Sequence, residues 1–193
     1  MVRLGGWLAG HPVPALGAGP LRAELIAGGK SNLTYRVRGG HGTVVLRRPP
    51  LGHVLATAHD MAREYRVISA LRPTAVPVPD ALALCRDAEV LGVPFYLMSD
   101  VPGTVYRTRA QTDALTGTQR RDLAYAMIDT LRDLHAVDPA TVGLGDVGRP
   151  EGYLARQVRR WAGQLDASRS RPLPGIDELR DRLLATVPPE RAA

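Results

Sequence analysis

The sequence predicts an α+β protein, in which a five-stranded, mainly antiparallel sheet with one inserted helix precedes a set of helices. Three observations predict this fold class. Five short segments of β character, bounded by Gly, Pro and Asp, lie within residues 21–101. One helical period, at 59–72, falls after the third of these segments, and only helical periods follow Val101-Pro102-Gly103. We therefore expect an irregular lead-in at 1–20, with at most a short helix, a sheet lobe at 21–101 and a helical lobe at 102–193.

The composition excludes several functional classes. The net charge is +6 over 193 residues, but the arginines are scattered and aromatic residues make up only 5% of the chain, so we expect no nucleic-acid partner. No run of eighteen apolar residues occurs, so we expect no membrane partner and a cytoplasmic protein. The single cysteine, Cys85, lies in an apolar run and is expected to be a buried structural thiol.

A glycine turn joins the first two predicted strands. The first strand is expected at 21–27, and Gly28 and Gly29 allow backbone amides to approach an anion to which Lys30 adds charge. Ser31 and Asn32 complete the turn. A phosphate is the natural guest of such a loop, but a hairpin whose glycines serve only the turn is the alternative, because the string matches no complete phosphate-binding motif.

The third predicted strand and the helix after it place two opposite charges near each other. Strand alternation puts Val45 and Arg47 on one face of the strand at 43–48. The helix at 59–72, with Thr57 as the expected N-cap, carries Glu64 within its apolar stripe. A carboxylate there is costly to bury unless it is paired, so we expect an ion pair between Glu64 and Arg47. The alternative is that Glu64 lies at the edge of the stripe and contacts water.

Two more strands complete the predicted sheet. They are expected at 80–86 and 94–100, joined by a turn at 87–92. The helical periods that follow the sheet are expected at 118–136, 151–168 and 176–187.

The order of these features resembles the nucleotide lobe of a kinase. The chain resembles the aminoglycoside phosphotransferase and choline kinase group of the protein-kinase-like fold, and more closely the phosphotransferase branch whose members also occur fused to acyl-CoA dehydrogenases. The strings that carry the closer match are AGGKSNLTYRV, VVLRRPPLGHVLATAHDMAREYRVISAL, VPVPDALALC, GVPFYLM, LRDLHAVDP and GLGDVGRPEGYLARQVRRW.

The resemblance implies an ATP-dependent phosphotransferase acting on a small-molecule hydroxyl. It implies that residues 28–32 cover the nucleotide phosphates, that Arg47 and Glu64 form the lysine–glutamate pair of kinases, and that Val45 lies in the nucleotide cleft. The segment 96–101 would be the linker that contacts the adenine. The site residues implied in that segment are Met98, Ser99 and Val101. Arginine in place of lysine is a departure from the wider kinase pattern.

The residues that perform phosphoryl transfer in the family are missing from these 193 residues. The family uses H-G-D-x-x-x-x-N and a later acidic motif, which supply the catalytic aspartate and the Mg²⁺ ligands. Asn32 is the only asparagine, so no later one can bind Mg²⁺. We therefore expect an incomplete helical lobe, a chain that looks truncated and no catalytic or metal residue here. The alternative is a non-catalytic nucleotide-binding or interaction module, which a complementary chain or self-association would complete.

Overall fold

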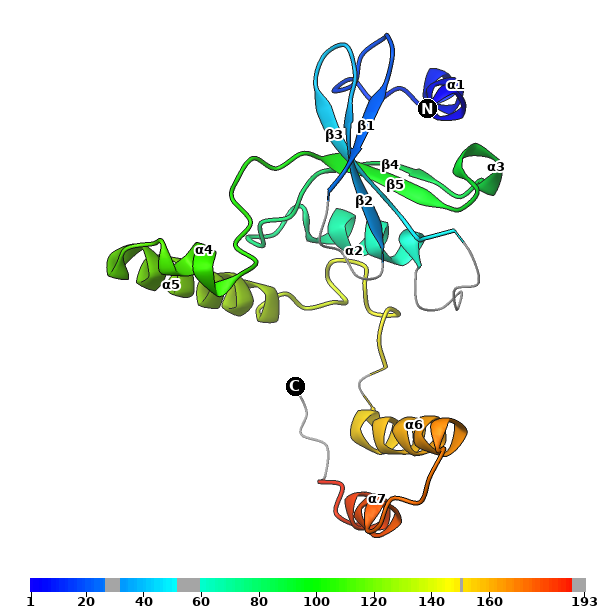
Figure 1. Cartoon of the computed structure of the whole chain (residues 1–193), viewed down its shortest axis with the longest axis vertical. Coiled ribbons are helices and arrows are strands. Elements are labelled where there is room, and N and C mark those ends of the chain that lie inside the picture. The colour runs from blue at the N-terminus through cyan, green and yellow to red at the C-terminus, as the bar shows by residue number, and fades with distance from the viewer. Residues whose placement is uncertain (27–31, 52–59, 150, 189–193) are drawn as a thin grey trace. The chain divides into compact units, whose positions relative to one another are not determined.

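The five predicted strands form one sheet. The computed structural model describes residues 1–26, 32–51, 60–149 and 151–188 (Figure 1). The strands lie in the order β1-β2-β3-β5-β4, and every neighbouring pair is antiparallel. Their bounds are β1 (Arg22–Leu25), β2 (Leu33–Arg38), β3 (Thr43–Arg48), β4 (Ala81–Cys85) and β5 (Phe95–Ser99). The predicted sheet is confirmed, with each strand somewhat shorter than its sequence segment.

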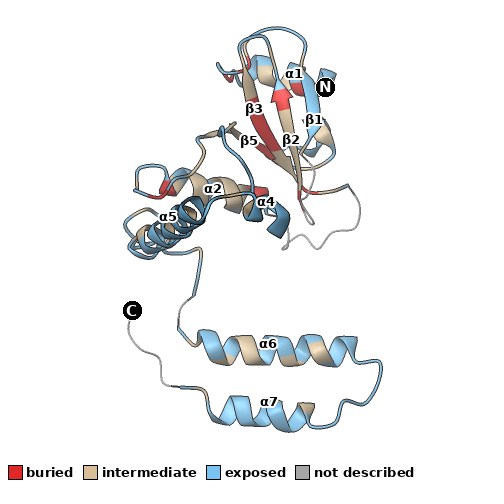
Figure 2. Cartoon of the chain, turned by 60° about the vertical axis from the view of Figure 1, so that its left-hand side comes forward, coloured by how far each residue is buried: buried red, intermediate tan, exposed pale blue. Residues whose placement is uncertain are grey.

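The main core lies on one face of this sheet. Strand register sets Tyr35 opposite Leu46 and Val37 opposite Val44, as the alternation of side chains predicts. Buried side chains from β5 and from the N-terminal residues join them, and Figure 2 shows buried segments on β2, β3 and β5. Cys85 belongs to this cluster, so the prediction of a buried thiol is confirmed, and burial raises its pKa.

The N-terminal residues are more ordered than their Gly and Pro content predicts. Helix α1 (Val2–Gly10) contributes Leu4, which is fully buried in the core cluster. The ring of Trp7 meets that of Phe95 edge-on, with centroids 5.3 Å apart. Packing of one apolar face thus outweighs the low helix propensity of the glycines in this segment.

Helix α2 (Met61–Leu71) follows β3 in the chain and contacts β4 and β5. The predicted N-cap at Thr57 is wrong, because the side chain of Asp60 accepts a hydrogen bond from the backbone N–H of Arg63 at 3.0 Å. Asp60 therefore caps the helix. The predicted turn at 87–92 contains a short helix, α3 (Ala88–Leu91), which Gly92 ends at a φ of 82°.

Four helices follow the sheet. They are α4 (Arg109–Asp113), which the sequence did not predict, α5 (Gly117–His135), α6 (Tyr153–Ser168) and α7 (Ile176–Ala185). Contacts within the chain divide it into two units, Met1–Gly145 and Asp146–Ala193. This division lies further along than the expected end of the sheet lobe at residue 101. In the second unit, Arg169 links α6 to α7 through an ion pair with Asp177 at 2.9 Å. None of the described helices is long and apolar enough to cross a membrane.

Candidate functional site

The face of the sheet opposite the main core carries polar side chains at matched positions. The register pairs Thr34 of β2 with Arg47 of β3, and Arg47 in turn with Tyr96 of β5. One step along, Val45 pairs with Met98. Because partners in register project from the same face, these residues form one surface, against which α2 packs. The sequence prediction that Val45 and Arg47 share a face is confirmed.

The predicted ion pair between β3 and α2 is present. The Nε of Arg47 donates to Oε2 of Glu64 at 2.7 Å. Each side chain is 32% exposed, so the pair is partly buried and both groups still contact water. The two readings of Glu64 are therefore both correct: the carboxylate is paired, and it lies where the apolar stripe of α2 meets solvent.

Two further donors converge on the same carboxylate. The Nδ2 of Asn32 donates to Oε1 of Glu64 at 2.9 Å, and the hydroxyl of Tyr96 donates to Oε2 at 3.1 Å. Burial, and then the neighbouring Glu64 carboxylate, raise the pKa of the Tyr96 phenol well above its usual value. Tyr96 therefore stays protonated and remains a donor throughout the physiological range.

A hollow of about 500 Å³ opens beside this cluster, between α2 and the polar face of the sheet. Apolar residues supply part of its wall, and two arginines line it with the Glu64 carboxylate. The lining residues are Arg47, Arg63, Glu64, Val67, Ile68, Pro79, Tyr96 and Met98. A wall with two guanidinium groups is suited to an anionic guest.

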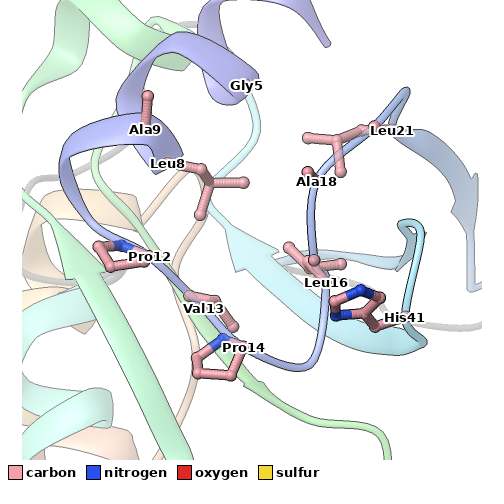
Figure 3. Close-up of a pocket in the computed structure, with 12 residues that line it drawn as sticks. Gly5, Leu8, Ala9, Pro12, Val13, Pro14, Leu16, Ala18, Leu21 and His41 are labelled. Carbon is pink, nitrogen blue, oxygen red and sulfur yellow. The ribbon is translucent and has the colours of Figure 1, made fainter.

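A second hollow of similar volume lies between α1 and the loop that follows it (Figure 3). Leucine, proline and alanine side chains form most of its wall, and His41 from the turn between β2 and β3 lies at one side. None of the residues that line it is Lys, Arg, Asp or Glu. The electrostatics therefore favour the hollow at Arg47, and not this one, as a site for phosphate groups.

The other predicted site residues fall into two groups. Gly28, Gly29, Lys30 and Ser31 lie outside the described residues, so their expected contact with phosphates stays a prediction. In the linker segment, the backbone N–H of Ser99 donates to the carbonyl of Asp80 at 2.9 Å, and Ser99 Oγ accepts from the N–H of Asp80. Val101 lies beyond β5 and is 62% exposed. The adenine contacts expected of Met98, Ser99 and Val101 also stay a prediction.

Tyr96 makes a contact that the sequence did not predict. It lies within β5, as the strand expected at 94–100 requires, directly opposite Arg47, and its hydroxyl contacts Glu64. The signal was present in the alternation of PFYLMSD, because Tyr96 must share a face with Met98. What the sequence lacks is the pairing of β5 with β3, which sets Tyr96 beside Arg47.

The side chains present fit a nucleotide better than they fit a metal ion. Arg47 and Arg63 provide charge for phosphates, and the apolar part of the hollow suits an uncharged ring. Within the part of the chain that the structure describes, no three His, Cys, Asp or Glu residues lie close enough together to hold a metal ion.

A five-stranded antiparallel sheet, with an arginine on its third strand paired to a glutamate on the next helix, is the arrangement of the N-terminal lobe in the protein-kinase-like fold. The profile of the Phosphotransferase enzyme family matches residues 22–193. The chain belongs to this family.

The relatives include long proteins of which this chain matches one part. It is 37% identical over 177 residues to Acyl-CoA dehydrogenase family member 11 of Gallus gallus, covering 92% of this chain and 22% of that protein. Acyl-CoA dehydrogenase family member 10 of Mus musculus is 35% identical over 161 residues, covering 83% of this chain and 15% of its own length. The chain thus spans about a fifth or less of these relatives. The expected kinship with phosphotransferase domains fused to acyl-CoA dehydrogenases is confirmed.

A solved structure shares the fold. A protein of Ralstonia eutropha JMP134, provisionally described as an aminoglycoside phosphotransferase, superimposes with a TM-score of 0.79 at 34% identity. The match covers 98% of this chain and 54% of that one. The predicted protein-kinase-like fold class is confirmed.

Proposed function

We propose that this chain binds ATP as the nucleotide lobe of a phosphotransferase. The phosphates would lie against Arg47 and the glycine turn at 28–31, and the base would lie beside Met98 and the segment that follows β5. The observation that carries this proposal is the ion pair between Arg47 and Glu64, which lines a hollow together with a second arginine, Arg63.

The chemistry of the pair supports a role in holding phosphate. Glu64 accepts a hydrogen bond from the Nε of Arg47, and Thr34 Oγ1 lies 3.5 Å from the Nη1 of Arg47. A guanidinium fixed by its Nε keeps its terminal nitrogens at a defined position, and such nitrogens bind phosphate oxygens with strong charge-assisted hydrogen bonds.

Binding of a nonhydrolysable ATP analogue to the purified chain tests the proposal. Arg47→Met should weaken binding about tenfold or more, since one charge-assisted contact contributes about 1.5–3 kcal/mol. Arg38→Met is the matched control, because Arg38 lies on the same face at the end of β2 and is exposed. Equal affinities of Arg47→Met and the parent chain would contradict the proposal, provided that circular dichroism shows the variant to be folded.

We further propose that the complete protein transfers the γ-phosphoryl group of ATP to the hydroxyl of a small molecule, in the cytoplasm. We propose a hydroxyacyl thioester, rather than an aminoglycoside, as the acceptor, because the relatives in which this chain matches one part are named acyl-CoA dehydrogenase family members. These 193 residues contain no asparagine after Asn32 and no H-G-D-x-x-x-x-N string, so the chain alone should show no turnover. Mg·ATP-dependent phosphorylation of a hydroxyl substrate by the purified chain would contradict this.

The second candidate function is a nucleotide-binding or interaction module completed by another polypeptide or by a second copy. The observation that favours it is the apolar surface of α5, where Met127 is 67% exposed and Ile128 is 64% exposed. Other large apolar side chains of α5 are exposed as well: Tyr125, Leu131 and Leu134. An exposed apolar patch of this kind is typical of a contact surface. Light scattering after size exclusion distinguishes the cases: a monomer at all concentrations argues against self-association, and a dimer supports it.

A further inference from the structure

Asn32 is the one buried side chain with an amide or a charge among those that the structure describes. It is 6% exposed and directly precedes β2. Its Nδ2 donates to Oε1 of Glu64, 32 residues further along the chain, at 2.9 Å. A residue that the sequence places in the phosphate loop therefore points its amide at α2. A buried amide is costly unless it is hydrogen-bonded, so the hydrogen bond to Glu64 is needed for Asn32 to be buried here.

The two oxygens of Glu64 are divided between different elements. Oε1 accepts from Asn32, while Oε2 accepts from Arg47 of β3 and Tyr96 of β5. A carboxylate held by three donors from three segments has little freedom to rotate. Arg47 is in turn held by the oxygen that Asn32 does not occupy.

We propose that Asn32 is a positioning residue of the nucleotide site, which fixes the Glu64 carboxylate so that Oε2 stays on Arg47. This inference rests on the proposed nucleotide-binding function. Asn32 acts through Glu64 and not by contact with phosphate. A neutral amide suits this role, since it can donate to a carboxylate without adding charge to a cluster that already holds Glu64, Arg47 and, at the hollow, Arg63.

Asn32→Asp tests the proposal, because it changes the donor into a carboxylate of nearly the same shape. Two carboxylates about 3 Å apart cannot both be ionised, so the folded variant must bind a proton that the parent chain does not. Among the residues that the structure describes, Asn32, Arg47 and Tyr96 contact Glu64, Arg63 lines the same hollow, and the ion pair with Arg47 is made through Oε2. Sharing a proton raises the pKa of this carboxyl pair in the folded variant above its value in the unfolded chain. The variant therefore loses free energy of unfolding as the pH rises.

The expected result has two parts. At about pH 8 the Asn32→Asp chain should unfold at a lower urea concentration than the parent chain. It should also bind the ATP analogue about tenfold more weakly, which is the change in an equilibrium constant that corresponds to a pKa shift of one unit. At about pH 5.5 both properties should return toward those of the parent chain. Gln164→Glu, the same chemical change on the exposed surface of α6, is the control and should show neither effect. Equal pH profiles for Asn32→Asp and the parent chain would overturn the proposal.

A swapped double variant covers the case in which Asn32→Asp does not fold at neutral pH. Asn32→Asp with Glu64→Gln restores one amide and one carboxylate at the contact, so it should recover stability at pH near 8 and lose the pH dependence. Additive losses in the double variant would overturn the proposal. The urea measurements need no ligand. If the parent chain fails to bind the analogue, the proposed function fails, while the contact between Asn32 and Glu64 is still tested by the urea profiles.

Discussion

Arg36 of β2 holds the carboxylate of Asp100, the residue directly after β5, through two contacts. The Nε–Oδ2 distance is 2.9 Å and the Nη2–Oδ1 distance is 3.4 Å. β2 and β5 are not neighbours in the sheet, because β3 lies between them, and Val45 is the β3 residue in register with Arg36. The ion pair therefore spans β3 on the face of the sheet that carries Val45. It links β2 to the segment after β5, where the base is proposed to bind.

The first prediction concerns the strength of this pair. Arg36 is 40% exposed and Asp100 is 24% exposed, so solvent screens the interaction. A double-mutant cycle with Arg36→Ala and Asp100→Ala should give a coupling of about 0.5–1 kcal/mol in urea unfolding, and less at high salt. Arg38→Ala, which removes an exposed arginine two residues along the same strand, is the control. A coupling of zero at low salt would show that the pair does not tie the two segments together.

The second prediction concerns α1. Leu4 is fully buried in the core cluster, so Leu4→Ala should lower the free energy of unfolding of the sheet unit by about 2–5 kcal/mol. Val2→Ala, at a position that is 92% exposed in the same helix, should change it by less than about 0.5 kcal/mol. Fluorescence of Trp7 in a Trp161→Phe background reports this unit alone. Similar effects of the two substitutions would mean that α1 is not part of the folded core.

The third prediction concerns the close approach of the lead-in to the turn between β2 and β3. A Cβ at Gly39 would lie 2.3 Å from the carbonyl oxygen of Leu16, and backbone cannot move aside as a side chain can. Gly39→Ala should therefore destabilise the chain by about 1–3 kcal/mol. Gly6→Ala, in α1 with no atom within 4 Å of the new Cβ, should instead stabilise it by up to about 1 kcal/mol. If Gly39→Ala left the free energy of unfolding unchanged, the lead-in at 1–20 would not pack tightly on this turn.

Much of this arrangement follows from local sequence patterns, and the rest depends on strand order. Alternation within 33–48 assigns Val45 and Arg47 to one face, and the position of Glu64 in an apolar stripe requires a cation nearby, so the pair is predictable. The contacts of Asn32 and Tyr96 with Glu64 are not, because they depend on which strands are neighbours and on where α2 crosses them. The packing of α1 is also unpredictable from propensity, since three of its nine residues are glycine.

The last prediction concerns the pH dependence that Tyr96 confers. Its pKa is raised in the folded chain, first by burial and then by Glu64, so the neutral phenol is the stabilising form. The stabilisation is complete below the unfolded pKa of about 10 and is lost as pH rises past it, by up to about 1.4 kcal/mol per pH unit. Tyr96→Phe should cost about 1–1.5 kcal/mol at pH near 8, for the lost hydrogen bond to Glu64. The stability difference between the two chains should therefore shrink between about pH 10 and pH 11 in urea unfolding. A difference that stays constant over this range would mean that the Tyr96 hydroxyl is not held against Glu64 in solution.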